Sequence, residues 1–423
     1  MVGNWEADAE HRYALHVRRY DVAVIGAGII GLGAARELLL RHPRLRLAVL
    51  DKEPVIGQHQ TAHNSGVIHS GIYYAPGSLK ARLCVQGARE LYAYCGEKGI
   101  PAERCGKVIV ASDESELPRL EALYQRGLTN GVEGVEIIGP ERLREIEPHC
   151  VGVKALWSPN TGIVDFSRVA AEYAHDVRCA SGDILPRHGV IGIAERADSV
   201  ALQTLGGEVE ARHVVACAGL YADRVARLSG GPREPRIIPF RGDYWVLRPN
   251  RRYLALNLIY PVPDPAFPFL GVHFTRRVSD GSVWLGPNAV LAFSREGYRR
   301  LDIRPVDIVD ALAYRGFLKL AARFWRTGLQ EMVRDFSTAA FLRSLQRYVP
   351  ELTPDDVLPG PSGVRAQALG PDGQLVDDFV FNTQGRRVVH VRNAPSPGAT
   401  SSLAIGRLIA DTVEQVFGLA GAP

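Results

Sequence analysis

The sequence predicts an α/β protein in which two domains exchange the chain several times, and three observations favour this fold class. Residues 20–52 have the pattern of a strand, a glycine-rich turn, a helix and a second strand. Residues 236–290 contain short strand-like runs separated by proline and glycine, as in an antiparallel sheet. The 423 residues also exceed the size at which one hydrophobic core usually stops growing.

The unit at residues 20–52 has the features of a dinucleotide site. Residues 22–25, VAVI, are typical of a buried parallel strand. Gly26, Gly28 and Gly31 follow as G-x-G-x-x-G, which permits a tight turn, close approach of the backbone to a pyrophosphate, and close packing of helix on strand. Asp51 ends the next strand, at the spacing where a carboxylate binds ribose hydroxyls and repels a 2′-phosphate. The unit therefore predicts a Rossmann-like domain for FAD or NAD rather than NADP.

The composition excludes several other classes of protein. Hydrophobic residues make up 46% and charged residues 23%, as in soluble globular proteins, and no apolar run is as long as a membrane span. A formal charge of +4 gives no reason to expect a nucleic-acid partner. The six cysteines show no zinc-type spacing, so we expect reduced thiols and no metal site. Residues 1–19 resemble neither a secretion signal nor a transit peptide, so we expect a cytoplasmic location.

The later segments alternate between the two domains. Residues 56–77 form a long polar loop, and long loops in compact domains are often functional. A helix near residues 78–99, a strand at 107–111 and a helix at 114–127 lead into the second domain, and a buried strand at 213–219 returns to the first. We assign residues 20–105, 150–235 and 360–423 to the dinucleotide domain. Residues 106–149 and 236–359 form an α+β substrate domain built on the antiparallel sheet.

Long motifs identify a family. The runs HQTAHNSGVIHSGIYYAPGSLKARLCVQG, PFRGDYWVL, FPFLGVHFT, GVRAQAL and HVRNAPSPGATSS resemble those of the L-2-hydroxyglutarate dehydrogenases, which belong with glycine oxidase and D-amino-acid oxidase. The resemblance implies noncovalent FAD and oxidation of L-2-hydroxyglutarate to 2-oxoglutarate by hydride transfer from C2. It also implies an electron acceptor other than NAD, such as a quinone. An amine or amino-acid oxidase of the same fold, or a noncatalytic flavin redox sensor, are the alternatives.

The resemblance also indicates substrate and catalytic residues. Arg365 resembles the arginine that holds the substrate carboxylate in glycine oxidase-like enzymes, since its planar fork binds carboxylates in bidentate fashion. His69 and His273 are both candidates for the base that takes the hydroxyl proton. The distal carboxylate has four secondary candidates, namely Tyr73, Lys80, Arg241 and Tyr260, although Arg241 could equally brace the domain crossing.

The predicted cofactor contacts come from four parts of the chain. Ala218 and Gly219 follow a buried strand and should approach the diphosphate or ribityl chain, while His63 is expected to contact the cofactor rather than act as the base. The full predicted set is Gly26, Gly28, Gly31, Asp51, Lys52, Thr61, His63, Asn64, Ser65, Ala218, Gly219, Ser396, Gly398, Ala399 and Thr400. The last four precede a helix, so their backbone N–H groups can face the flavin.

Residues 314–326 predict a basic amphipathic helix. Its apolar face consists of Tyr314, Phe317, Leu318, Ala321, Phe324 and Trp325. Such a face could lie in the interface of an anionic membrane, on the inner side and close to a quinone pool. The alternative, which is far commoner for amphipathic helices, is that the same face packs inside the substrate domain.

Overall fold

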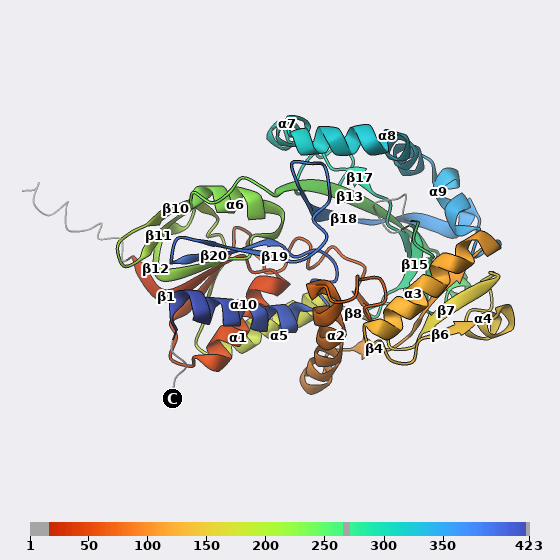
Figure 1. Ribbon diagram of the computed structural model, residues 1–423, viewed down its shortest axis with the longest axis horizontal. Helices are drawn as coiled ribbons and strands as arrows, with labels where there is room; N and C mark the ends of the chain where they lie inside the picture. Colours follow the sequence, from red (N-terminus) through yellow and green to blue (C-terminus); the bar gives the residue numbers. More distant parts are fainter. Residues whose placement is uncertain (1–16, 265–270, 420–423) are drawn as a thin grey trace, which may run out of the picture.

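The computed structural model describes residues 17–264 and 271–419. Predictions for residues 1–16, and for the part of the motif FPFLGVHFT that falls within 265–270, lie outside these ranges. The described chain forms two lobes side by side, one around β1 and α1 and the other around β13 and β18 (Figure 1). The predicted α/β fold class is confirmed.

The first lobe contains an eight-stranded sheet in the order β10-β11-β12-β1-β2-β9, with β20 paired to β12 and β19 to β20. Its parallel strands are β1 (Arg18–Ile25), β2 (Leu47–Leu50), β9 (Asp183–Leu185), β12 (Gly207–Ala216) and β20 (Val388–Asn393). The antiparallel strands are β10 (Val190–Glu195), β11 (Val200–Thr204) and β19 (Val380–Gln384).

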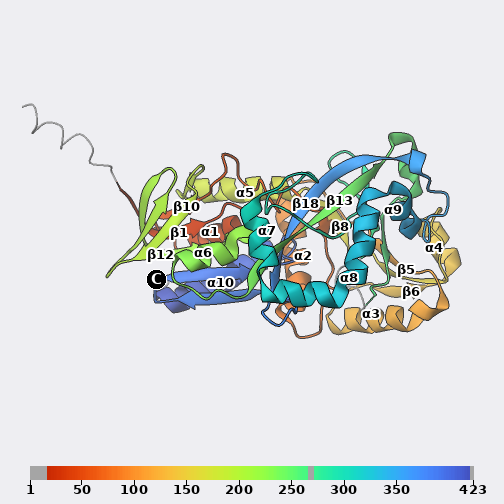
Figure 2. The same cartoon turned by 90° about the horizontal axis from the view of Figure 1, so that it is seen from above.

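Helices cover both faces of this sheet (Figures 1 and 2). On one face lie α1 (Ile29–Arg41), α2 (Leu79–Lys98), α5 (Phe166–Cys179) and α10 (Ser402–Phe417), and on the other α6 (Ala222–Leu228). The α1 and α10 backbones pack closely, because a Cβ on Gly406 would lie 2.7 Å from the Gly33 carbonyl oxygen.

Local signals set several helix ends where the sequence predicts them. Asp165 caps α5 by accepting a hydrogen bond from the Ser167 backbone N–H. Ser78 caps α2 in the same way, and Gly99 ends α2 with a left-handed φ of 64°, which glycine adopts without steric cost.

The second lobe contains a nine-stranded mixed sheet in the order β17-β13-β16-β15-β14-β5-β7-β6, with β18 paired to β13. Its strands are β5 (Lys107–Ala111), β6 (Glu136–Ile138), β7 (Lys154–Ser158), β13 (Arg236–Leu247), β14 (Leu258–Pro261), β15 (His273–Arg276), β16 (Val283–Gly286), β17 (Val290–Leu291) and β18 (Val357–Leu369). Most pairs are antiparallel, as predicted, but β14 runs parallel to β5.

Strand β18 is not apparent from the sequence, because its prolines and glycines are typical of a turn. It pairs along its length with β13 alone, and an edge strand tolerates proline where no partner needs the missing N–H. The expected domain boundaries at residues 150 and 360 differ from the sheet topology. Strands β7 and β18 both belong to the second sheet, so the chain returns to the first lobe only after each of them.

The helices of the second lobe are α3 (Leu117–Thr129), α4 (Pro140–Ile146), α7 (Pro305–Leu312), α8 (Arg315–Phe336) and α9 (Thr338–Leu345). A third, small sheet of β3 (Val67–Ile68), β8 (Gly162–Val164) and β4 (Ala102–Glu103) lies between the lobes. Among the described residues, no helix is long and apolar enough to cross a membrane.

The residues of the predicted apolar face at 314–326 differ in how deeply they are buried. Tyr314 and Phe317 are buried against β13 and β18, Phe324 is half-buried there, and Trp325 is 60% exposed. The backbone of α8 departs from helical geometry at Phe324, with φ of −116° and ψ of 23°, so the helix is kinked there.

Candidate active site

A cavity of about 1500 Å³ lies between the two sheets. One end is lined by the β1–α1 turn and the other by β13, β14, β15, β18 and α3. This volume exceeds the roughly 300–1,000 Å³ typical of a site for one small ligand, and so has room for a dinucleotide together with a substrate.

The β1–α1 turn forms an open cradle at the N-terminus of α1. A Cβ at Gly26 would overlap the Cys217 carbonyl oxygen, and a Cβ at Gly31 would overlap the carbonyl oxygen of Gly26. A Cβ at Gly28, in contrast, would meet only the Thr61 hydroxyl, at 3.5 Å. Gly28 therefore faces open space in front of the helix, where the free N–H groups and the helix dipole favour a phosphate.

Asp51 stands beside this cradle at the end of β2. Its carboxylate accepts hydrogen bonds from the backbone N–H groups of Ala27, at 2.6 Å, and Glu53, at 2.9 Å. These bonds fix the side chain, and each oxygen keeps a further acceptor position for a ribose hydroxyl. The residues of this end therefore fit a dinucleotide such as FAD.

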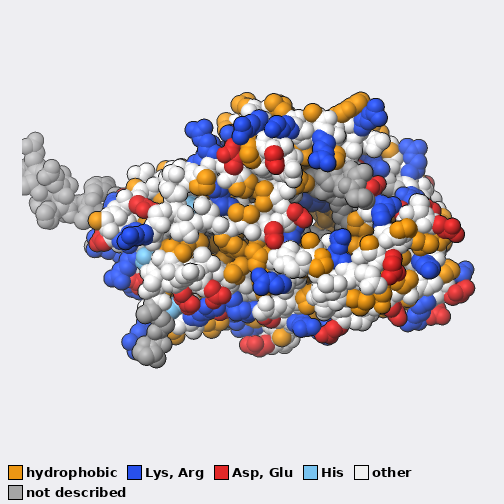
Figure 3. Space-filling model, viewed as in Figure 1, with side chains coloured by type: hydrophobic (Ala, Val, Ile, Leu, Met, Phe, Trp, Pro, Cys, Tyr) orange, Lys and Arg blue, Asp and Glu red, His pale blue; other side chains and the backbone are white. Residues whose placement is uncertain are grey.

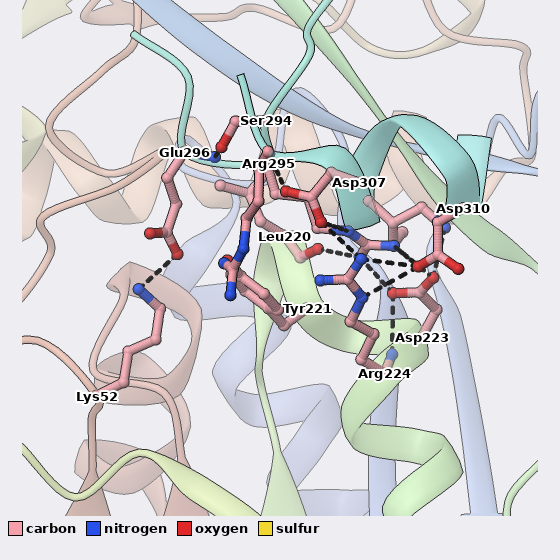
Figure 4. Close-up of polar contacts among 12 residues, drawn as sticks. Lys52, Leu220, Tyr221, Asp223, Arg224, Ser294, Arg295, Glu296, Asp307 and Asp310 are labelled. Carbon is pink, nitrogen blue, oxygen red and sulfur yellow. Dashed lines mark hydrogen bonds and ion pairs between the residues drawn. The ribbon is translucent and has the colours of Figure 1, made fainter. Parts of the chain in front are cut away.

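A segment of the second lobe, residues 294–310, clasps the nucleotide end (Figure 4). Arg295 and Asp223, each with a side chain only 3% exposed, form a bidentate ion pair. The other ion pairs of the clasp are Lys52 with Glu296 at 2.6 Å, and Arg224 with Asp307 at 2.6 Å and with Asp310 at 2.7 Å. Since removing one partner of a buried pair typically costs about 3–5 kcal/mol, the clasp fixes the lobes to each other.

Within the described ranges, Glu53, His59 and Glu296 have the spacing of metal ligands. The ammonium of Lys52 already contacts all three side chains, at 2.9 Å from His59 Nε2 and 2.6 Å from Glu296 Oε1. This ammonium supplies the positive charge that the carboxylates require, so we assign no metal to the cluster.

The other end of the cavity brings together six of the predicted side chains, namely His69, Tyr73, Lys80, Tyr260, His273 and Arg365. The predicted cofactor residues line the same cavity. Among them, His63 stacks on Tyr298 with ring centres 3.9 Å apart, and its Nδ1 donates to the Ser362 carbonyl oxygen at 2.8 Å. His63 is thus held by its ring and one nitrogen.

His273, at the start of β15, has a defined tautomer. Its Nδ1 lies 2.8 Å from the Gly271 carbonyl oxygen, which can only accept, so Nδ1 bears the proton and Nε2 the lone pair. The ring stacks on Tyr260 with centres 3.9 Å apart. Burial, assisted by the positive charge of Arg365, lowers the pKa of His273 to about 3, so the imidazole is neutral at neutral pH.

His69, directly after β3, faces the same space. Its backbone N–H donates to the Thr400 hydroxyl at 3.1 Å, and its Nε2 lies 3.5 Å from Ser396 Oγ. Its Nδ1 is buried and has no hydrogen-bond partner within the described residues. Burial, with a smaller contribution from the Lys107 charge, lowers the pKa of His69 to about 3.

The predicted cations differ in their surroundings. Arg365 extends from β18 and lines the cavity. The Lys80 ammonium lines it too, but is paired with Asp377 at 2.7 Å. Arg241 does not line the cavity, because its guanidinium is bound to Asp243 at 2.9 Å and Asp335 at 3.1 Å. Both partners belong to the second lobe, so these contacts support neither a role in substrate binding nor a brace at the domain crossing.

Two arginines of α3 line the cavity although sequence patterns gave no sign of it. Arg126 donates to the Tyr73 carbonyl oxygen at 3.0 Å, and Arg119 donates to the Pro263 carbonyl oxygen at 3.2 Å. The sequence predicts their helix, but the spacing of its residues does not show which distant loops the two arginines contact.

Residues 21–412 match the family model described as FAD dependent oxidoreductase. The chain is 53% identical to the mitochondrial L-2-hydroxyglutarate dehydrogenase of Nematostella vectensis, covering 95% of this chain and 91% of that protein. It is 52% identical to the human mitochondrial enzyme of the same name, over 95% and 90%. It is 44% identical to the L-2-hydroxyglutarate dehydrogenase of Indibacter alkaliphilus, over 93% and 98%.

Solved structures show the same fold at low sequence identity. The FAD-bound L-α-glycerophosphate oxidase of Mycoplasma pneumoniae has a TM-score of 0.77 at 22% identity, over 96% of both chains. Glycine oxidase from Geobacillus kaustophilus has a TM-score of 0.71 at 21% identity, over 94% of this chain and 95% of that one. By the family model and these relatives, the chain belongs to the FAD dependent oxidoreductases and, among them, to the L-2-hydroxyglutarate dehydrogenases.

Proposed function

We propose that this protein oxidises L-2-hydroxyglutarate to 2-oxoglutarate. The supporting observation is one continuous cavity that joins a dinucleotide cradle to a cluster of neutral imidazoles beside Arg365. FAD, held by the β1–α1 turn, Asp51 and the loop before α10, would accept the hydride from C2 when bound. The relatives that are 44–53% identical to this chain are named for this activity.

Two carboxylates of the substrate must be held while C2 reacts. Arg365 is suited to one of them, because a guanidinium presents two parallel N–H groups to a carboxylate. Tyr73, Tyr260 and Lys80 line the same end of the cavity and are our candidates for the other. Holding both ends fixes the orientation of C2, which reduces the entropic part of the barrier.

We assign the base to His273, with His69 as the second candidate. The hydrogen bond to Gly271 leaves Nε2 of His273 with a lone pair that can take the hydroxyl proton. The base must be neutral before the reaction, and burial keeps both imidazoles neutral. Replacing the base by Asn should slow anaerobic flavin reduction far more than it weakens substrate binding. If neither His273→Asn nor His69→Asn does so, the base is another group.

The decisive experiment is anaerobic mixing of the purified flavoprotein with one substrate at a time. L-2-hydroxyglutarate should bleach the flavin, while glycine and D-amino acids should not. Bleaching by an amine substrate instead would favour the amino-acid oxidase alternative. An unbleached flavin with every substrate would favour a noncatalytic redox sensor.

We further propose that the reduced enzyme passes electrons to a quinone while α7 and α8 rest on a membrane surface. Their outer surface exposes Val306, Val309, Leu318, Trp325, Met332 and Phe336, by 51–74% of each residue. The first part of α8 also carries four exposed basic residues, namely Arg315, Lys319, Arg323 and Arg326. Hydrophobic and basic side chains also alternate over α7 and α8 in Figure 3. This combination fits an anionic lipid interface.

Vesicle sedimentation tests the membrane contact. The wild type should pellet with anionic vesicles at low salt and less at high salt, and Trp325→Asp with Met332→Asp should abolish pelleting. Leu128→Asp with Val151→Asp, two exposed apolar positions outside α7 and α8, is the matched control. Equal pelleting of both double variants would contradict the contact. A cytoplasmic location stays a prediction, since several relatives are described as mitochondrial enzymes.

A further inference from the structure

Lys107 is a buried lysine in the middle of the second sheet. It is the first residue of β5, and its backbone is in register with Ser158 of β7 on one side and Leu258 of β14 on the other. The residue is only 1% exposed. Lysine is almost never fully buried unless it is paired with an acidic group.

The nearest polarisable groups are two aromatic rings. The Lys107 ammonium lies 4.6 Å from the centre of the Tyr73 ring and 5.0 Å from that of Tyr260. Within residues 17–264 and 271–419, it makes no hydrogen bond and no ion pair. Cation–π attraction compensates only part of the lost hydration, and burial lowers the pKa of Lys107 to about 7. For folding alone, an apolar side chain of similar length would be more favourable here.

Lys107 lies against two rings that line the cavity, but does not line it itself. Its charge therefore acts on a bound molecule from behind Tyr73 and Tyr260. The Tyr73 hydroxyl is buried and has no hydrogen-bond partner within the described residues. A cation over a phenol ring draws electron density from it and makes the hydroxyl a stronger donor to an anion.

Arg365, Lys80 and the α3 arginines Arg119 and Arg126 all line this end of the cavity. Lys80 is paired with Asp377, so its charge is already partly balanced before any ligand binds. A ligand with two carboxylates brings one more negative charge to this end than a monocarboxylate does, so a further cation beside Tyr73 and Tyr260 favours the dicarboxylate.

We propose that Lys107 is a specificity-determining residue: from behind Tyr73 and Tyr260, its ammonium balances the second carboxylate of the substrate and so selects dicarboxylates over monocarboxylates. The inference rests on the proposed oxidation of a five-carbon dicarboxylate. It deepens that proposal by naming the group that distinguishes one carboxylate from two.

Lys107→Met, in the FAD-loaded enzyme, tests the proposal. We measure inhibition constants for glutarate and butyrate, the dissociation constant of 2-oxoglutarate from the change in flavin absorbance, and the melting temperature. Glutarate and 2-oxoglutarate should bind about tenfold more weakly, while butyrate should change by less than about twofold. KM should rise more than kcat falls, and the melting temperature should stay constant or increase because a buried charge is removed.

Controls separate this role from a structural one. Lys154→Met makes the same substitution at an exposed position of the neighbouring strand β7 and should leave both inhibition constants unchanged. Tyr73→Phe should weaken glutarate binding. The loss of binding free energy in the double variant with Lys107→Met should be smaller than the sum of the losses in the two single variants.

Two results would overturn the proposal. One is equal weakening of glutarate and butyrate, and the other is loss of FAD with a lower melting temperature in both Lys107→Met and Lys107→Gln. If the wild-type flavin is not bleached by L-2-hydroxyglutarate but glutarate binding depends on Lys107, the proposed reaction fails and the dicarboxylate selectivity stands.

Discussion

The two ends of the cavity are built in different ways. The nucleotide end consists mainly of residues 26–61, in which one turn and one strand place Gly28, Asp51 and Thr61 side by side. The substrate end draws His69, His273 and Arg365 from three distant segments, joined only by sheet pairing and by packing. Spacing in the sequence therefore determines the geometry of the first end, whereas the second depends on the whole fold.

The largest effect should follow from a methyl group in the glycine turn. Gly31→Ala places a Cβ on the Gly26 carbonyl oxygen, so we expect a protein that melts at a lower temperature and contains no FAD. Gly28→Ala is the matched control, because its Cβ meets only Thr61 at 3.5 Å. It should keep the melting temperature of the FAD-free protein and still lose the cofactor on dialysis. Normal FAD content in Gly31→Ala would show that the turn is not rigid.

At the substrate end, Arg365→Lys should cause the next largest loss. The charge remains but the planar fork is lost, so we expect kcat/KM for L-2-hydroxyglutarate to fall about ten- to a thousand-fold. The FAD content should stay normal, since Arg365 lies at the opposite end from the dinucleotide turn. Steady-state kinetics with flavin quantification measures both quantities. A parallel loss of flavin would mean that the two ends are not independent.

Asp51→Ala should have a moderate effect confined to the cofactor. We expect the dissociation constant of FAD to rise about ten- to a hundred-fold, because hydrogen bonds to the ribose and to Ala27 and Glu53 are removed. Titration of the FAD-free protein by fluorescence measures this constant. Asp51→Asn, which keeps one acceptor oxygen, should lose less, and an unchanged affinity in both variants would contradict the assignment.

The smallest effect concerns a histidine outside both ends. Burial, with a smaller contribution from Arg392, lowers the pKa of His390 to about 4, so the unfolded chain binds more protons below about pH 6.5. Stability should therefore fall as the pH falls from about 6.5 towards 4, with about 1 kcal/mol lost through this group at pH 5.5. Chemical unfolding of wild type and His390→Gln across this range should show a shallower loss in the variant. Identical pH profiles would exclude His390 as a contributor.

Sequence patterns predicted those parts of the fold that local chemistry controls. The strand at 107–111 coincides with β5, and the helix expected near residues 78–99 is α2, which Gly99 ends. The same patterns did not reveal β18, where proline and glycine are compatible with an edge strand. They predicted a helix at residues 314–326, which α8 largely contains, but left its packing open, and Tyr314 is buried whereas Trp325 is exposed.

The cofactor end of the site was predictable in the same way, from glycine spacing and Asp51. At the substrate end, the family resemblance named His69, His273 and Arg365, and all three line the cavity. Lys107 and the α3 arginines were missed because their importance arises from neighbours far away in the chain. Arg241 does not line the cavity, because Asp335 of α8 binds its guanidinium, and spacing in the sequence does not reveal a contact between such distant segments.

The close packing of α1 and α10 has a consequence for biosynthesis. The glycine turn leaves the ribosome early, but Gly33 meets Gly406 and Ser402 only after α10 has been made. The loop of residues 396–400, which lines the cavity, is also synthesised just before α10. A nascent chain that ends before this point exposes an apolar face of α1 and has no complete flavin pocket. A complete flavin pocket therefore requires a nearly finished polypeptide, and the cofactor cannot cover the apolar face of α1 in shorter nascent chains.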